Sequence, residues 1–282
     1  MARPLRLEFA GALYHIMSRG DNKQVIFKTD HDRNRFFRVY SEIYKRLNWT
    51  TYAWCLMDNH YHLVVETPGP TLSEGMRLLN GIYTQYFNHA HGRVGHLFQG
   101  RFHSIVVDKD SYLVELVRYV VLNPVRSGLV RQPEEWPWSS YRATAGLDIC
   151  PEWLDADWVT DVVSDGAGSR EQKIKQYRAF VEEGLQGKAD LMDQVQQQIY
   201  LGDEDFVARV QEACEIGPHL AEVVREQKRK PLLQLDDYGR QFPSQKEAMA
   251  RAYLSGHYSQ AEIARHFGVH YSTVSKATSE YK

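Results

Sequence analysis

The first half of the chain alternates between short runs of β-branched and aromatic residues and longer segments in which apolar positions recur at helical spacing. The short runs predict strands at residues 12–18, 50–57, 60–66 and 103–108. The longer segments predict helices at residues 31–47, 71–90 and 111–122. Asp58 and Asn59 are expected to form a tight hairpin turn between the second and third strands. The order β-α-β-β-α-β-α predicts an α+β fold, with a ferredoxin-like split βαβ antiparallel sheet and helices on one face.

Residues beyond 146 show a different pattern. Residues 147–168 are rich in Asp, Gly and Ser and indicate a loop or linker, and short helices are expected at about 170–185 and 206–216. A further helix is predicted at 244–254. We therefore expect three parts: an α+β domain at 1–146, an acidic linker and helical region at 147–239, and an all-α unit at 240–282.

The last part has the pattern of a helix-turn-helix unit. Ser259 and Glu262 form an S-x-x-E capping box at the start of a helix, and Gly268 is placed to make the following tight turn. Ile263, Ala264 and Phe267 are expected to form the apolar face, with Val269 and Val274 packing the next helix. That recognition helix would begin near His270. Its first candidates for groove or phosphate contact are Ser272, Thr273 and Lys276. The alternative is a small packing unit that does not bind DNA.

Charge is distributed unevenly, although the net charge is only −2. Lys and Arg number 18 against 13 Asp and Glu in residues 1–146, 10 against 20 in 147–239, and 6 against 3 in 240–282. Two mildly basic ends around an acidic middle are compatible with a nucleic-acid partner. Three widely separated cysteines and the lack of a long apolar run predict a cytoplasmic protein without disulfides or membrane contact.

Two histidines open the third predicted strand, His60 and His62, before the apolar run 63–65. Side chains two apart on a strand point to the same face, so the two imidazoles are expected side by side. Paired imidazoles are common ligands of divalent metals. The alternative is two histidines that share a face without binding a metal.

A second segment with candidate chemistry is the last predicted helix of the first domain. Tyr119 and Asn123 are four residues apart, which places them on one helix face, and Pro124 predicts that the helix ends near Asn123. Read alone, this segment also fits a half-buried tyrosine on an amphipathic helix with asparagine as its C-terminal stop.

Together these segments resemble the single-tyrosine branch of the HUH endonuclease superfamily, in its REP-associated tyrosine transposase (IS200-like transposase) group. Four blocks carry the resemblance in order: residues 14–22, 54–63, 95–102 and 118–126. The C-terminal unit is similar to the helix-turn-helix of chromosomal replication initiators.

The resemblance implies metal-dependent DNA nicking and strand transfer through a 5′-phosphotyrosine intermediate on single-stranded or hairpin DNA. Tyr119 would be the nucleophile, and His60, His62 and Asn123 would hold a divalent metal ion, Mg or Mn. Tyrosine is a poor nucleophile at its ordinary pKa near 10, so it needs such an activator. Tyr112, Tyr83 and Tyr86 are rival nucleophiles, which only the family motif disfavours.

Basic and aromatic residues near these blocks are candidates for DNA contact. The basic candidates are Arg19, Arg101, Lys109, Arg118 and Arg126, and the candidates for base stacking are Tyr61, Phe98 and Phe102. The alternative functions are a DNA-binding regulator that retains the fold without catalysis and a hydrolase that uses metal-bound water. Duplex DNA is a further expected partner of the helix-turn-helix, and the protein is expected to be a monomer or a homodimer.

Overall fold

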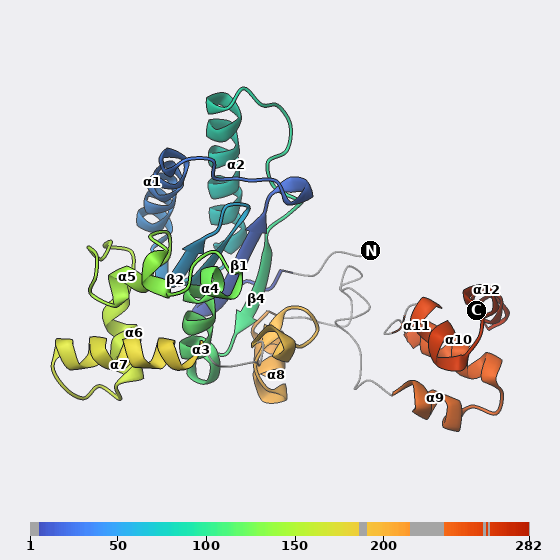
Figure 1. Ribbon diagram of the computed structural model, residues 1–282. Helices are drawn as coiled ribbons and strands as arrows, with labels where there is room; N and C mark the ends of the chain where they lie inside the picture. The colour runs from blue at the N-terminus through green and yellow to red at the C-terminus, as the bar shows by residue number, and fades with distance from the viewer. Residues whose placement is uncertain (1–5, 186–190, 215–233, 256–257, 259, 282) are drawn as a thin grey trace. The chain divides into compact units, whose positions relative to one another are not determined.

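The computed structural model describes residues 6–185, 191–214, 234–255, 258 and 260–281. These residues form two compact units, one within 6–214 and the other within 234–281 (Figure 1). The main elements of the first unit are β1 (Ala12–Arg19), α1 (Asp30–Leu47), β2 (Thr50–Leu56), β3 (His60–Thr67), α2 (Leu72–Ala90), β4 (His103–Val107) and α3 (Lys109–Val121). The α+β class and the order β-α-β-β-α-β-α are confirmed.

Five strands form one mixed sheet in the order β2-β3-β1-β4-β5. The first four are antiparallel neighbours, as the split βαβ pattern predicts, whereas β5 (Tyr200–Leu201) pairs parallel with β4. In the register of β1 with β3, Val64 lies opposite His15 and His62 lies opposite Met17. His15 and His62 are therefore diagonal neighbours across two central strands.

Different helices cover the two faces of the sheet. Tyr61 faces α1 and α2: its ring centroid lies 4.8 Å from that of Phe36, and its hydroxyl donates to Asn80 Oδ1 at 2.6 Å. Side chains alternate along a strand, so His62 and Val64 face the other way. There Val64 packs with α3 in one hydrophobic cluster. The expectation that helices cover only one face is corrected, because α1 and α2 cover one face and α3 the other.

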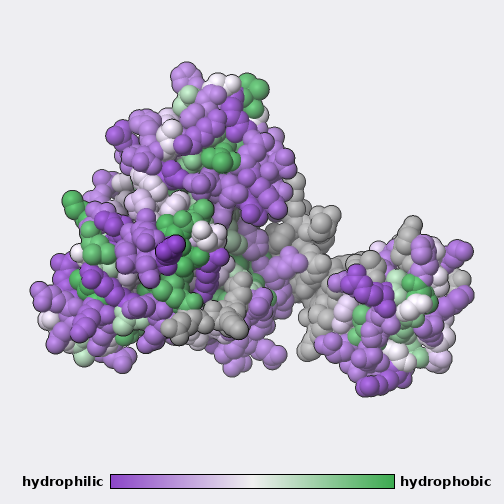
Figure 2. All heavy atoms as spheres, in the orientation of Figure 1, coloured by the Kyte–Doolittle hydropathy of each residue, from purple (hydrophilic) through white to green (hydrophobic). Residues whose placement is uncertain are grey.

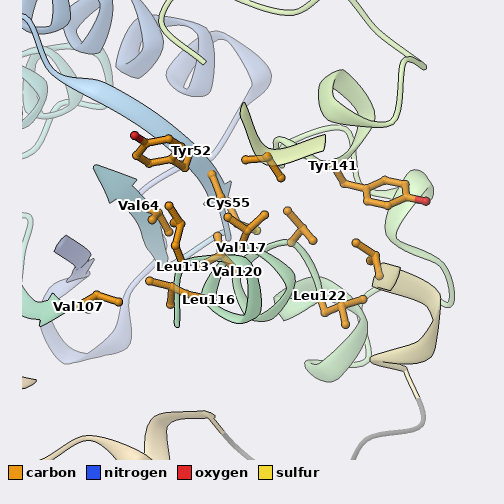
Figure 3. Packing of buried hydrophobic residues seen from close by; sticks show 14 of the residues in the cluster. Tyr52, Cys55, Val64, Val107, Leu113, Leu116, Val117, Val120, Leu122 and Tyr141 are labelled. Atoms are coloured by element: carbon orange, nitrogen blue, oxygen red, sulfur yellow. The ribbon is translucent and has the colours of Figure 1, made fainter. Parts of the chain in front are cut away.

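The apolar stripe of α3 fixes this helix across the sheet. Leu113, Leu116, Val117 and Val120 are at most 1% exposed and pack with the strand residues of the cluster, including Val64 (Figure 3). Burial of such a stripe is the main stabilisation of an amphipathic helix. Because the stripe faces the sheet, the side chains next to it on α3 are held over the face that carries His62.

The ends of α3 fix where Tyr119 and Asn123 lie along the chain. The N-cap of α3 is Asp108, and Ser111 Oγ donates to Asp108 Oδ2 at 3.2 Å. The helix ends at Val121, and a separate turn of helix, α4 (Asn123–Arg126), contains Pro124 near its start. The predicted helix end near Asn123 is confirmed to within two residues, although Asn123 itself begins the next helical turn.

The remaining elements of the first unit are short. They are η1 (Asp21–Lys23), η2 (Pro133–Glu135), α5 (Tyr141–Thr144), α6 (Ala156–Val163), α7 (Arg170–Glu183), η3 (Leu191–Gln194) and α8 (Glu204–Ala213).

Residues beyond 146 continue the first unit. Val159 of α6, Val181 of α7 and Leu201 of β5 are buried in the same cluster as α3. The segment 147–168, expected as loop, contains α6, which starts where the Asp155 side chain accepts from Trp158 N at 3.1 Å. The expected boundary at 146 therefore does not separate compact units. The Asp-rich composition indicated a linker, but one of these aspartates, Asp155, caps a helix whose buried Val159 packs in the same cluster as α3.

The second unit is all-α, with α9 (Leu235–Gln241), α10 (Gln245–Ser255), α11 (Gln260–Phe267) and α12 (Tyr271–Glu280). Ile263 and Ala264 of α11 and Val274 of α12 are buried together, and Gly268 between the helices has φ +65°. The predicted apolar face and tight turn are confirmed. Ser259 of the predicted capping box lies outside the described residues.

A close contact of Gly75 gives a prediction about stability. A Cβ on Gly75 of α2 would lie 2.2 Å from the ring of Trp49, which is 1% exposed and donates from Nε1 to Thr71 Oγ1 at 2.9 Å. We expect Gly75→Ala to lower the free energy of unfolding by about 1–3 kcal/mol, despite the better helix propensity of alanine. Gly81→Ala is the matched control, because nothing lies within 4 Å of its Cβ. It should raise stability by up to about 1 kcal/mol. Urea unfolding measures the free energies of both variants, and equal effects would contradict the predicted clash of the new Cβ with the Trp49 ring.

The visible surface of the described residues is largely hydrophilic, with hydrophobic residues in separate small groups (Figure 2). Among the helices that the structure describes, none combines the length and the apolar character that crossing a membrane requires.

Candidate functional site

Two histidines of β3 lie side by side on the face that α3 covers. His60 is half-buried and His62 is 3% exposed, and their ring centroids are 5.0 Å apart in a T-shaped arrangement. His60 Nδ1 lies 2.7 Å from Asn59 Oδ1. An amide oxygen only accepts, so His60 Nδ1 carries the proton and its Nε2 keeps a lone pair. The predicted pairing of the two imidazoles on one strand face is present.

A third histidine, His15 of β1, completes this face. It is fully buried, its ring stacks on that of His62 with centroids 5.2 Å apart, and its Nε2 lies 2.9 Å from His62 Nδ1. We did not identify His15 as a site residue from the sequence. The strand pattern of residues 12–18 places it on one face of β1, but only the pairing register shows which residue it meets.

Tyr119 of α3 lies against the rings of His62 and His15. Its ring lies edge-on to His62 with centroids 6.3 Å apart and edge-on to His15 at 5.9 Å. Asn123 follows one turn later, and its Nδ2 donates to Tyr119 O at 3.0 Å. This bond occupies the amide nitrogen, so the amide oxygen is the atom of Asn123 that remains for a ligand. The structure thus brings Tyr119 to the histidine pair and holds Asn123 beside it on the helix end.

Burial keeps these imidazoles neutral. It lowers the pKa of His60 to about 4, with a further effect from the charge of Arg19, and it lowers the pKa of His62 well below its ordinary value. Burial likewise lowers the pKa of His15 to about 3, aided by His103. A neutral imidazole offers one nitrogen lone pair, which is the form that binds metals.

The donor set fits a divalent metal. His62 Nε2 is buried and has no hydrogen-bond partner, and His60 Nε2 has a lone pair on the same face. No group of three His, Cys, Asp or Glu side chains that could hold a metal occurs in the part of the chain that the structure describes. A metal at His60 and His62 would therefore need a ligand of another kind. Asn123 carries an amide oxygen of this kind, so the types of donor atom present fit the metal set that the sequence indicated.

The buried histidines predict a dependence of stability on pH. His15 stays neutral in the folded protein down to about pH 3, whereas in the unfolded chain it takes up a proton near pH 6.5. Its folded pKa is the lower one, so acidification below about pH 6.5 favours unfolding, with a slope of about 1.4 kcal/mol per pH unit from this group. In His15→Phe, the slope between pH 6 and pH 4.5 should fall by this amount, as measured by denaturant unfolding. An unchanged slope would contradict the role of His15.

Two cations predicted to contact DNA lie at the site. The guanidinium of Arg126 is 5.0 Å from the centroid of the Tyr119 ring. Arg19 is exposed at the end of β1, directly opposite His60 in the strand register. Both can meet a negatively charged group bound near Tyr119.

Two other predicted contacts are engaged elsewhere. Lys109 Nζ lies 2.7 Å from Glu66 Oε2, at the far end of β3 from His60. Arg118 pairs with Glu115, and its guanidinium lies 4.3 Å from the centroid of the Phe180 ring of α7. The structure therefore places Lys109 away from the site and uses Arg118 to hold α7 on α3.

A basic pocket lies between α2 and the segment 96–102. Its volume is about 600 Å³, and its lining includes Arg101 and Phe98, which the sequence indicated, together with Arg6 and Arg77. The Arg6 guanidinium lies 3.8 Å from the centroid of the Phe102 ring. The segment adjoins the site end of β1, because Gln99 N donates to Arg19 O at 2.8 Å. Arg6 and Arg77 were missed, since single arginines outside a motif carry no sequence signal.

The rival tyrosines do not lie at the histidine pair. Tyr83 is buried on the other face of the sheet and donates to Ile26 O, and Tyr86 donates to Asp32. Tyr61, expected to stack on bases, is also buried on that face. Tyr112 is on α3, two turns before Tyr119.

In the second unit, the side chains chosen for DNA contact lie at the start of α12. Ser272 and Lys276 are exposed and Thr273 is partly exposed, whereas Val274 and Ala277 are buried in the core of the unit. The His270 side chain caps the helix by accepting from Ser272 N. The three polar residues are thus free of the packing face.

Comparisons with known proteins agree with this organisation. Residues 9–123 match the family model "Transposase IS200 like", and residues 245–282 match a helix-turn-helix domain model. A Haemophilus influenzae protein assigned to the REP-associated tyrosine transposases is 25% identical over 159 residues, which cover 52% of this chain and 88% of that protein. The REP-associated tyrosine transposase of Escherichia coli K12 is 28% identical over 121 residues, which cover 42% and 67%.

A solved structure of a REP-associated tyrosine transposase bound to a REP hairpin contains a similar chain. It is 20% identical, with a TM-score of 0.44, and the match covers 60% of this chain and 93% of that chain.

Proposed function

We propose that this chain nicks DNA and transfers a strand through a covalent tyrosine intermediate, because residues 9–123 match the IS200-like transposase family model. The substrate proposed is single-stranded or hairpin DNA. The observation that carries the proposal is the edge-on contact of Tyr119 with His62, beside a second neutral imidazole on the same sheet face. A phenol placed against two potential metal ligands is the arrangement that this chemistry requires.

The proposed reaction uses Tyr119 as the nucleophile. Tyr119 Oη attacks the scissile phosphorus and loses its proton, a new phosphorus–oxygen bond forms, and the bond to the 3′ oxygen breaks. The products are a 5′-phosphotyrosine and a free 3′-hydroxyl, and attack by a 3′-hydroxyl on the phosphotyrosine reverses the step on another strand. The aryl ester keeps the phosphodiester bond energy, so no nucleotide cofactor is needed.

The chain's own residues orient the reactants. His60, His62 and Asn123 would hold a divalent metal, Mg or Mn, and a metal there would stabilise charge on the scissile phosphate. Arg126 and Arg19 flank the tyrosine and the histidine pair, where each can attract DNA phosphates. The basic pocket with Arg101 and Phe98 can take the neighbouring single strand. The hydrophobic cluster under α3 keeps the Tyr119 ring in place.

For the second unit, we propose that α12 contacts duplex DNA through Ser272, Thr273 and Lys276. Their position at the start of the helix after a tight turn is that of a recognition helix. This contact would bring the first unit to its substrate.

The proposal is tested by looking for a covalent adduct between the protein and DNA. Wild-type protein is incubated with labelled hairpin-containing single-stranded DNA and Mn²⁺ or Mg²⁺, and the mixture is separated on a denaturing protein gel. We expect a band of protein joined to DNA, with Tyr119 as the modified residue in mass spectrometry. Chelation by EDTA should remove the band, and a duplex without a hairpin should give none. Cleavage without an adduct would instead indicate a hydrolase, and a gel shift without cleavage would indicate a regulator.

A further inference from the structure

His15 is a buried polar side chain in the middle of a central strand, where its neighbours are apolar or aromatic. Its burial therefore needs an explanation. Its neighbours on β1, Tyr14 and Ile16, are fully buried, and the side chain itself has no exposure. A buried imidazole is costly unless its nitrogens are paired. The pairing that the structure provides is the 2.9 Å contact of His15 Nε2 with His62 Nδ1.

Two neutral imidazoles share one proton in such a contact, which leaves two arrangements. If His15 Nε2 donates, then His62 carries its own proton on Nε2, a buried atom without an acceptor. If His62 Nδ1 donates, then His62 Nε2 has an unprotonated lone pair, and His15 carries its proton on Nδ1, which is also buried without a partner. The two arrangements therefore leave the same number of buried N–H groups unpaired, and they differ in what they leave at His62 Nε2. Only the second arrangement lets His62 bind a metal, because the ligating nitrogen must be free of its proton.

We propose that His15 is a positioning residue, which accepts the Nδ1 proton of His62 and so fixes its ring with the Nε2 lone pair directed to the metal site. This inference rests on the proposed function, since it assigns a role within the same metal site. His60 has its own partner for the same purpose in Asn59 Oδ1. Each of the two histidines therefore has an acceptor at Nδ1, one from a turn and the other from the neighbouring strand.

The geometry gives His15 a second contact with the reaction centre. The Tyr119 ring lies edge-on to both imidazoles, at centroid distances of 5.9 Å from His15 and 6.3 Å from His62. The stacked pair is thus one surface against which the tyrosine rests. A change at position 15 that keeps a flat ring should preserve this surface and remove only the acceptor.

The experiment compares His15→Phe with His15→Gln in the full chain. Phenylalanine keeps the stacked ring but has no acceptor, whereas the Gln Oε1 can accept from His62 Nδ1. Mn²⁺ binding is measured without DNA, by calorimetry or by the electron paramagnetic resonance signal of free Mn²⁺. We expect His15→Phe to bind Mn²⁺ about 10–100-fold more weakly, and His15→Gln to stay within a few-fold of wild type. Wild-type affinity in His15→Phe would overturn the inference.

A second measurement needs no variant and no metal. The nitrogen chemical shifts of the His62 side chain report which ring nitrogen is protonated. We expect a protonated Nδ1 and an unprotonated Nε2 in the metal-free wild-type protein, and the opposite tautomer would overturn the inference even if His15→Phe fails to fold. If the wild-type protein gave this tautomer but neither bound Mn²⁺ nor formed the covalent adduct, the proposed function would fail, and the role of His15 toward a metal would fail with it.

Discussion

Tyr119→Phe is expected to abolish covalent attachment to DNA and to lower the cleavage rate by a factor on the order of 10⁴ or more. The substitution removes one oxygen, the proposed nucleophile, and leaves the ring that packs against His15 and His62. The fold and the affinity for hairpin DNA should therefore be unchanged. Rates are measured with labelled single-stranded hairpin DNA and Mn²⁺, and affinity by gel shift on the same DNA.

Tyr112→Phe is the matched control for this prediction. Like Tyr119, Tyr112 lies on α3 and packs at the edge of the same hydrophobic cluster. The substitution removes the same atom, the hydroxyl oxygen. It should cleave at the wild-type rate and form the adduct. If Tyr119→Phe cleaved normally while the adduct was absent, metal-activated water would be the nucleophile. If Tyr112→Phe lost the adduct instead, the motif match would have selected the wrong tyrosine.

The core of the first unit was predictable because its elements have distinct periodicities. A short run of β-branched and aromatic residues identified 60–66, and the helical repeat of apolar positions identified 111–122, each within a few residues of β3 and α3. The placing of α3 on the second face was not predictable in this way. Its stripe of Leu113, Leu116 and Val117 shows which side is buried, but not against which face of the sheet.

The same limit applies to the site. The two-residue spacing of His60 and His62 and the four-residue spacing of Tyr119 and Asn123 are local, so the sequence shows them directly. The contact of His15 with His62 depends on the register of two strands that are 47 residues apart. Arg118 shows the same limit: it lies in a motif block, but the block does not show that its guanidinium pairs with Glu115 and lies over the Phe180 ring.

His60→Ala is expected to separate metal binding from DNA binding. His60 is half-buried, and its side chain contacts Asn59 Oδ1 and the edge of the His62 ring, so its removal should cost little stability. It removes one of two imidazole ligands, and loss of the metal's stabilisation of phosphate charge amounts to several kcal/mol. The cleavage rate should therefore fall by about 10³-fold. The affinity for hairpin DNA should be retained, because Arg19, Arg126 and the basic pocket are unchanged.

His31→Ala is the control for a histidine at a distance from this site, since His31 lies on α1, which covers the other face of the sheet. It should cleave at the wild-type rate at every Mn²⁺ concentration. His60→Ala should regain part of its activity as Mn²⁺ is raised, because a weakened metal site fills at higher concentration. A rate for His60→Ala equal to wild type at low Mn²⁺ would mean that the histidine pair holds no catalytic metal. Burial alone would then account for the neutral state of both imidazoles.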